Sequence, residues 1–129
     1  MSDMIGNFLT IIRNAIAVSK RSVEVPHSRM REAIAAVLKL EGFIRDYEVS
    51  VNEDNHKRLT VQLKYLNGES AIHELKRISK PGLRRYAGSN NIEPVISGLG
   101  ISVLTTNRGV ITDKQARKMA VGGEIICQV

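Results

Sequence analysis

The chain has 129 residues, 43% of them hydrophobic and 25% charged, a balance typical of folded rather than disordered proteins. This length allows one medium domain or two very small domains that share an interface. The apolar runs are too short to cross a membrane, and the N-terminus lacks the basic start and long apolar stretch of a secretory signal. Cys127 is the single cysteine, which excludes a disulfide framework and favours a reducing compartment.

The basic charge is concentrated in the C-terminal part of the chain. The formal net charge is +6 at pH 7. Residues 1–78 carry twelve Lys/Arg and ten Asp/Glu, a net of +2, whereas residues 79–129 carry seven and three, a net of +4. Such a local excess is typical of a protein that binds a polyanion. General solubility is the alternative explanation of the same charge.

The N-terminal third of the sequence predicts two helices and a strand. Apolar side chains at helical spacing favour a helix over residues 3–18, with Ser2 or Asp3 as its N-cap. Residues 23–25 follow as a short strand. A second helix is expected over residues 28–42, between a serine cap and a glycine stop. This order predicts that both helices cover one face of a sheet.

An alternating pattern then predicts a β-hairpin. Residues 47–51 and 59–65 alternate apolar and polar side chains on either side of an Asn/Asp-rich turn. Asn67-Gly68 is a strong signal for a second tight turn. The apolar residues of segment 71–78 are spaced for either a helix or a strand. We predict a strand there, as the third antiparallel partner of the sheet.

The amino-acid composition of the chain changes after Ile78. Residues 79–91, SKPGLRRYAGSNN, are rich in Gly, Ser, Pro and Asn. We therefore expect an N-terminal α/β domain at residues 1–78, a basic linker loop at residues 79–91 and a C-terminal α/β domain at residues 92–129. The fold class is α+β, with N-terminal helices on a three-stranded sheet and a mostly β C-terminal domain that has a short helix.

The C-terminal domain is expected to contain short helices and strands only. These are a helix at residues 92–99, strands at 101–104 and 110–111, a helix at 112–120 and a strand at 124–129. Thr112 and Gln115 form a capping box at the start of the second helix, and Gly122-Gly123 ends it.

The residue types favour neither a metal site nor catalysis. His27, His56 and His73 have no carboxylate or thiol at ligand spacing, so we predict no metal and no cofactor. Cys127 lies in an apolar strand and is expected to be a small buried hydrophobe. Nucleophilic catalysis by Thr105 requires a positioned base, and no nearby motif supplies one.

Two clusters have the chemistry of an RNA-binding surface, and the first is residues 79–86, SKPGLRRY. Lys80, Arg84 and Arg85 supply cations for phosphates, and an exposed Tyr86 is able to stack on a base or ribose. The alternative is a basic interdomain linker with Tyr86 packed inward.

The second cluster consists of Thr105, Thr106, Asn107 and Arg108, followed by Gly109. Its hydroxyl and amide groups donate and accept hydrogen bonds, which suits the shallow minor groove of A-form RNA, while Arg108 suits a phosphate. Gly109 permits a close backbone approach or a positive φ. Neighbouring residues of a strand point to opposite faces, so one of the two threonine hydroxyls faces RNA unless the chain bends. An ordinary turn is the alternative.

The polar face of the first helix is a further RNA-binding hypothesis. It presents Arg13 and Asn14, with the Lys20-Arg21 pair just beyond its end. Such a face is also compatible with simple solvation.

The sequence resembles a known family. The segments SKPGLRRY, GLGISVLTTNRGVITDKQARK and GGEIIC occur in the order and at the spacing of the bacterial-type small-subunit ribosomal protein eight family. The resemblance extends upstream through IRNA, VPHSRMR and LKLEGFI, so it covers essentially the whole chain. Thr105 and Asn107 stand where serine is common in the family, and Gln128 stands where an aromatic residue is usual.

This resemblance implies two intimately packed α/β domains and a primary binder of the central domain of small-subunit ribosomal RNA. The bound element is a helix with an irregular internal loop, and binding helps to organise the platform during assembly. The implied neighbours are the fifth and twelfth small-subunit proteins, with no membrane and no small-molecule substrate. The implied location is the small subunit of cytoplasmic ribosomes, with an organellar ribosome as the open alternative.

Carried over by motif, the implied RNA-binding residues are the Thr105–Arg108 turn and the stacking Tyr86, with Gly122, Gly123 and Glu124 beside them. We therefore interpret the chain as a structural RNA-binding protein without catalysis. One rival is a protein–protein adaptor whose basic loop meets an acidic partner. The other is a small enzyme that uses the Thr105/Thr106 turn.

Overall fold

The computed structural model describes residues 3–92 and 100–129. They divide into two compact units, one ending at His73 and the other running from Glu74 to Val129. The predicted helix at residues 92–99 lies, apart from Ile92, outside the described residues. No helix that the structure describes is long and apolar enough to cross a membrane.

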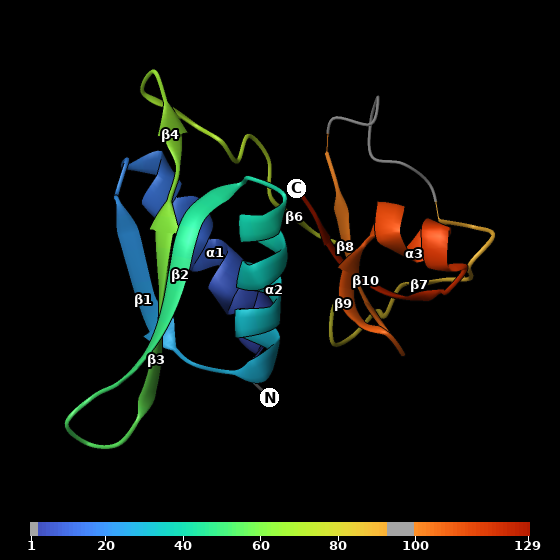
Figure 1. Ribbon diagram of the computed structural model, residues 1–129, viewed down its shortest axis with the longest axis horizontal. Helices are drawn as coiled ribbons and strands as arrows, with labels where there is room; N and C mark the ends of the chain where they lie inside the picture. The colour runs from blue at the N-terminus through green and yellow to red at the C-terminus, as the bar shows by residue number, and fades with distance from the viewer. Residues whose placement is uncertain (1–2, 93–99) are drawn as a thin grey trace. The chain divides into compact units, whose positions relative to one another are not determined.

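The N-terminal unit is a three-stranded antiparallel sheet with two helices (Figure 1). Its main elements are α1 (Met4–Ala17), β1 (Ser22–Pro26), α2 (Arg29–Leu40), β2 (Ile44–Val51) and β3 (Lys57–Leu63). The strand order is β1-β3-β2, so β3 is central. The two predicted helices and the predicted hairpin are therefore confirmed.

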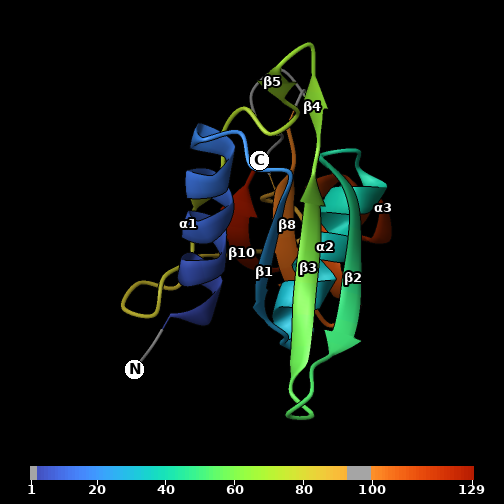
Figure 2. The same cartoon turned by 90° about the vertical axis from the view of Figure 1, so that its left-hand side faces the viewer.

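Both helices lie on the same face of this sheet. Val23 and Val25 of β1 alternate with exposed residues, and Leu59, Val61 and Leu63 of β3 alternate with half-buried or exposed ones. The buried set faces the helices, which contribute apolar residues of their own to this core. The opposite face is uncovered within this unit and is turned toward the viewer in Figure 2.

The helix caps follow the sequence closely. The Asp3 carboxylate accepts a hydrogen bond from the Gly6 N–H at 3.0 Å, and the Ser28 hydroxyl accepts one from the Arg31 N–H at 3.0 Å. Each cap satisfies a backbone donor that the first helical turn leaves without a partner. Gly42, just beyond α2, has φ +82°, a conformation that glycine adopts without strain.

Arg31 is a buried cation that joins three parts of the N-terminal unit. It is 3% exposed, and its guanidinium donates to the carbonyl oxygen of Pro26 at 2.8 Å. Two further N–H groups donate to the carbonyl oxygen of Met4, at 3.1 and 3.3 Å. The guanidinium also lies over the Phe8 ring, 5.8 Å from its centroid. Arg31 therefore connects α2 to the first turn of α1 and to the end of β1.

The predicted turn at Asn67-Gly68 is confirmed. Both residues have positive φ, +53° and +80°, as a tight two-residue hairpin turn requires. The turn joins two short strands, β4 (Tyr65–Leu66) and β5 (Glu69–Ser70).

The predicted strand at residues 71–78 was wrong in extent and in partner. Only Lys76–Arg77 forms a strand, β6, and it pairs with β10 of the C-terminal unit. The third position in the N-terminal sheet belongs to β1, where Val25 lies opposite Leu59. β3 pairs with β2 on one edge and with β1 on the other, so neither edge of β3 is free to pair with residues 71–78.

The C-terminal unit is built around one strand, β10 (Gly123–Gln128). It pairs with β8 (Ser102–Thr106) along one edge, and along the other with β6 and with β7 (Tyr86–Ala87). β9 (Gly109–Thr112) continues the sheet beyond β8, and α3 (Asp113–Met119) follows it. β7 lies within the predicted linker, so that part of the basic segment belongs to the sheet.

One apolar cluster of this unit packs beneath α3. It contains Ile92, Leu104, Ile111 and Ala116, each at most 8% exposed. The predicted capping box is confirmed, since Thr112 and Gln115 exchange side-chain and backbone hydrogen bonds at the start of α3. Cys127 is fully buried, so the prediction of a small buried hydrophobe is confirmed, and burial raises the pKa of its thiol to about 12.

Replacing Arg31 with alanine tests its structural role. The substitution removes the donors to the carbonyl groups of Met4 and Pro26, so we expect the free energy of unfolding to fall by about 2–4 kcal/mol in urea denaturation. Arg29→Ala is the matched control, because Arg29 is exposed at the start of the same helix. That control should change stability by no more than about 0.5 kcal/mol. Equal losses in both variants would mean that the contacts of Arg31 add no stability.

Candidate nucleic-acid interface

Three predicted site residues form one row across the sheet of the C-terminal unit. Glu124 of β10 lies opposite Tyr86 of β7 on one side and opposite Thr105 of β8 on the other. Directly opposite residues of antiparallel strands share a face. Tyr86, Glu124 and Thr105, which are distant in sequence, therefore present their side chains on the same face of the sheet.

The next row points to the other face. It contains Ala87, Gly123 and Thr106, and Ala87 packs against the core beneath α3. The strand remains regular through Thr106, so the two threonines do point in opposite directions. Thr105 is the threonine that accompanies Tyr86.

Gly122 and Gly123 are required by the close approach of three strands. A Cβ atom on Gly123 would lie 2.2 Å from the carbonyl oxygen of Thr105, and one on Gly122 would lie 2.4 Å from that of Ala87. Both distances are far below van der Waals contact with backbone that has no freedom to swing aside. Any side chain here would separate β10 from β8 or β7. The role that the structure gives these glycines is therefore steric.

Residues 79–86, the basic loop, fold as a narrow hairpin. Lys80 and Leu83 exchange two backbone hydrogen bonds of 3.0 Å, with Pro81 and Gly82 between them at the tip. Arg85 accepts a backbone bond from Ile125 at 2.9 Å, which attaches the loop to β10. The three cations of the loop are exposed, and Tyr86 is 71% exposed. Tyr86 is thus not packed inward within this unit.

Glu124 anchors the basic loop to the sheet. Its carboxylate accepts a hydrogen bond from the Ser79 hydroxyl and a second, of 3.0 Å, from the Arg84 guanidinium. The Ser79 oxygen in turn accepts a bond from the Arg85 N–H at 3.2 Å. Ser79 is 2% exposed, so the loop is connected to β10 through a buried polar contact.

The environment of Glu124 favours its charged form. Burial acts to raise the pKa of the carboxyl, but the hydrogen bonds from Ser79 and Arg84 and the charges of Arg84 and Arg77 outweigh it. The pKa of Glu124 is therefore lowered from its ordinary value. At neutral pH the carboxylate is ionised and able to accept both bonds.

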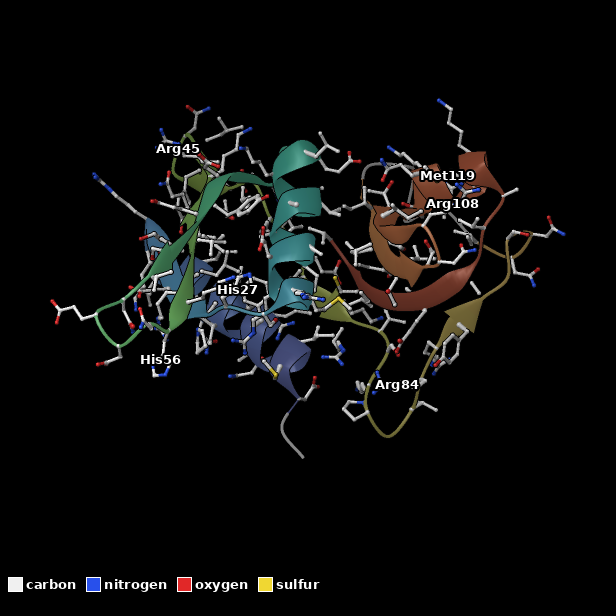
Figure 3. The ribbon with its side chains drawn as sticks, turned by 60° about the horizontal axis from the view of Figure 1, so that its bottom comes forward. His27, Arg45, His56, Arg84, Arg108 and Met119 are labelled. Atoms are coloured by element: carbon white, nitrogen blue, oxygen red, sulfur yellow. The ribbon has the colours of Figure 1, made fainter. Side chains whose placement is uncertain are left out.

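The turn from Thr106 to Gly109 connects β8 to β9. The Thr106 hydroxyl donates to the Gly109 carbonyl at 2.9 Å and accepts from the Arg108 N–H at 3.0 Å, so it stabilises the turn itself. Gly109 has φ +101°, which confirms the predicted need for glycine. Asn107 and Arg108 are exposed at the tip. Figure 3 shows Arg84 and Arg108 on two separate loops of this unit.

Arg13 and Asn14 belong to the other unit. Both are exposed on α1, as are Lys20 and Arg21 after its end. The structure therefore assigns these predicted residues to a helix face of the N-terminal unit, separate from the row on β7, β10 and β8.

The sequence does not indicate that Lys76 and Arg77 lie beside the basic loop, or that Ser79 anchors that loop. A cavity of about 350 Å³ beside the basic loop is lined by Lys76 and Arg77 together with Lys80 and Arg85. The sequence predicts Lys76 and Arg77 in the N-terminal sheet, although their basic character continues into SKPGLRR. The burial of Ser79 had no local signal, because its partner is Glu124, which is distant in sequence.

Comparison with known proteins decides the family. The family model for ribosomal protein S8 matches residues 3–129. The small ribosomal subunit protein uS8 of Latilactobacillus sakei is 51% identical over 100% of this chain and 98% of its own length. The proteins of the same name from Psychromonas ingrahamii and Stenotrophomonas maltophilia are 49% and 46% identical over the same shares.

The chain belongs to the ribosomal protein S8 family. The family resemblance predicted from the sequence motifs is therefore confirmed. Members of this family are structural components of the ribosome and not enzymes, which removes the hypothesis of an enzyme that uses the Thr105/Thr106 turn. The α+β class, with helices on a three-stranded sheet and a mostly β second unit, is also confirmed.

The lowered pKa of Glu124 predicts a stability difference that depends on pH. A carboxylate whose folded pKa is depressed stabilises the fold above its ordinary value of 4.5, and this contribution disappears as the pH falls through the folded pKa. Glu124→Gln should therefore be less stable than the parent chain near pH 6, and the gap should close as the pH falls below about 4.5. Urea denaturation across this pH range measures the gap. Glu69→Gln, an exposed substitution in the other unit, is the control. A stability difference between Glu124→Gln and the parent chain that stays constant down to about pH 3 would contradict the anchoring role.

Proposed function

We propose that this protein is a structural component of the small ribosomal subunit that binds the central domain of its ribosomal RNA. The binding surface consists of Tyr86, Glu124 and Thr105 on the sheet, with the basic loop on one side and the Thr106–Gly109 turn on the other. The observation that carries the proposal is the row itself, because it combines an exposed aromatic ring with a hydroxyl between two groups of cations.

Each part of this surface suits a different part of an RNA helix. An exposed tyrosine ring stacks on an unpaired base or a ribose, and unpaired bases occur at irregular internal loops. The Thr105 hydroxyl has no hydrogen-bond partner within the described chain, so it is available to a 2′-hydroxyl or a base edge in the minor groove. Lys80, Arg85 and Arg108 are exposed and suit the phosphates on either side.

The proposed surface also depends on three residues whose role is structural: Thr106, Gly122 and Gly123. The Thr106 hydroxyl is engaged within the turn, where it helps to present Asn107 and Arg108. The glycines allow β10 to lie close to both β7 and β8, so that only one strand separates Tyr86 from Thr105. Arg13 and Asn14 remain a second RNA-binding hypothesis, on the N-terminal unit.

The proposed consequence of binding is assembly. A small protein that holds an irregular helix of the central domain stabilises the local RNA fold on which the platform is built. The expected neighbours are the fifth and twelfth proteins of the small subunit, and the expected location is the cytoplasmic ribosome. The names of the relatives, all small ribosomal subunit proteins, support the coarser part of this proposal.

Two pairs of variants test the central row. Tyr86→Ala should weaken binding of the purified full chain to small-subunit ribosomal RNA by about 1–3 kcal/mol, whereas Tyr86→Phe, which keeps the ring, should bind like the parent chain. Thr105→Val should cost about 1–2 kcal/mol, and Thr105→Ser, which keeps the hydroxyl, should cost much less. Filter binding at fixed salt measures each affinity, and thermal denaturation checks the fold.

An adaptor would give a different pattern. If Tyr86→Ala and Thr105→Val both bind this RNA like the parent chain, the row is not an RNA-binding surface. If an acidic polypeptide such as polyglutamate displaces the RNA as well as unlabelled ribosomal RNA does, the basic loop recognises charge alone, and the adaptor hypothesis replaces the proposal.

A further inference from the structure

The open face of the N-terminal sheet carries a cavity lined mostly by polar residues, which the surface proposed above does not use. Its volume is about 570 Å³. It is lined mainly by Arg21, Ser22, Arg45, Thr60, Gln62 and Tyr65. These residues lie at or just before the start of β1, in the second half of β3, and at the starts of β2 and β4. Figure 2 turns this face of the sheet toward the viewer.

The backbone around Arg21 is held firmly. The Arg21 carbonyl accepts a hydrogen bond from the Leu63 N–H at 2.8 Å, and the next residue, Ser22, lies opposite Gln62 in the sheet. The Tyr65 hydroxyl donates to the Lys20 carbonyl at 2.6 Å. Tyr65 therefore closes one side of the cavity and fixes the segment that carries Arg21.

Arg45 reaches the cavity because of an irregularity in β2. Ile44 lies opposite Leu63 and Asp46 opposite Gln62, so Arg45 is the extra residue of a bulge. A bulge changes the direction of the side chain it carries. Figure 3 shows Arg45 at this end of β2. Two arginines from different strands thus line one cavity.

Two acids on the edge strands of this sheet, β2 and β1, are paired with other cations. Asp46 lies 2.9 Å from the Lys39 ammonium, and Glu24 lies 2.9 Å from the Arg58 guanidinium. Neither Arg21 nor Arg45 has a side-chain hydrogen bond or ion pair within the described chain. Glu48 lies opposite Thr60 in the sheet but is not among the residues that line the cavity.

We propose that this cavity binds the sugar–phosphate backbone of ribosomal RNA. Arg21 and Arg45 hold a phosphate, and Ser22, Thr60 and Gln62 donate to and accept from neighbouring 2′-hydroxyls. Guanidinium groups match phosphate oxygens in pairs, and short hydroxyl and amide side chains are common partners of the sugar–phosphate backbone. The inference goes beyond the proposed function, because it assigns an RNA contact to the open face of the N-terminal sheet, distinct from the face of α1 that carries Arg13 and Asn14.

An RNA backbone fits this cavity better than an acidic protein does. The buried centre of a protein–protein interface is depleted in charge and rich in apolar surface. The lining here offers a tyrosine ring and Leu63, which is only 3% exposed, and is otherwise polar. A ligand that is hydrophilic along its whole length meets these groups without leaving polar atoms unpaired.

Arginine modification by a dicarbonyl reagent, read by mass spectrometry, tests the site. The full chain is compared free, bound to small-subunit ribosomal RNA alone, and in assembled small subunits. We expect Arg21 and Arg45 to be protected already by the RNA alone. Protection only in assembled subunits would mean that a protein covers the cavity and would overturn the proposal, as would equal reactivity in all three states. Arg84 and Arg85 in the same samples report separately on the surface of the C-terminal unit.

Salt-dependent binding provides the second measurement. The double variant Arg21→Gln/Arg45→Gln should reduce the slope of log affinity against log salt by about one to two units for small-subunit ribosomal RNA. A control with the same change of charge, Lys57→Gln/Lys118→Gln, alters two exposed lysines outside both surfaces and should leave the slope nearly unchanged. Both proteins should melt like the parent chain. Equal slopes for the two double variants would overturn the proposal while leaving the tests of Tyr86 and Thr105 intact.

Discussion

The absence of side chains at Gly122 and Gly123 is the constraint on which the C-terminal unit depends. With the Cβ positions only 2.2 and 2.4 Å from backbone oxygens of Thr105 and Ala87, the three strands are as close as backbone allows. This closeness puts Tyr86, Glu124 and Thr105 in adjacent positions across β7, β10 and β8. An alanine at either glycine would lose no contact of its own, yet it would separate the ring from the hydroxyl. The glycines therefore act on the candidate surface through geometry, without contacting a ligand.

Polar contacts, rather than apolar packing alone, attach the loops of both units. Arg31 holds the first turn of α1 and the end of β1 through carbonyl oxygens, and Glu124 holds the basic loop through Ser79 and Arg84. A buried polar group that is satisfied fixes one arrangement, because any other leaves it without partners at a considerable cost. Each contact thus determines where a loop lies.

Local signals predicted most of the fold, and non-local pairing explains what they missed. Caps at Asp3, Ser28 and Thr112 and the Asn67-Gly68 turn act within a few residues, so the sequence displays them directly. The partner of residues 76–77 is β10, and nothing near those residues indicates it. The same limit applies to the candidate site. Its residue types and motifs are visible in the sequence, but only the register of β10 shows that Thr105, and not Thr106, shares a face with Tyr86.

Glu124 also explains how an acid belongs in a surface that we propose for a polyanion. A free carboxylate there would repel phosphates, but this one is 18% exposed and accepts bonds from Ser79 and Arg84. Its charge is balanced by Arg84, so Lys80, Arg85 and Arg108 remain as the exposed cations of the two loops that form no ion pair within the described residues. Without that carboxylate the loop would carry one more unbalanced positive charge and would lose its side-chain contacts with β10, leaving the backbone bonds to Ile125. The acid thus reduces the total positive charge of the surface while fixing the position of the cations that remain, and fixed cations lose less entropy when they meet a phosphate.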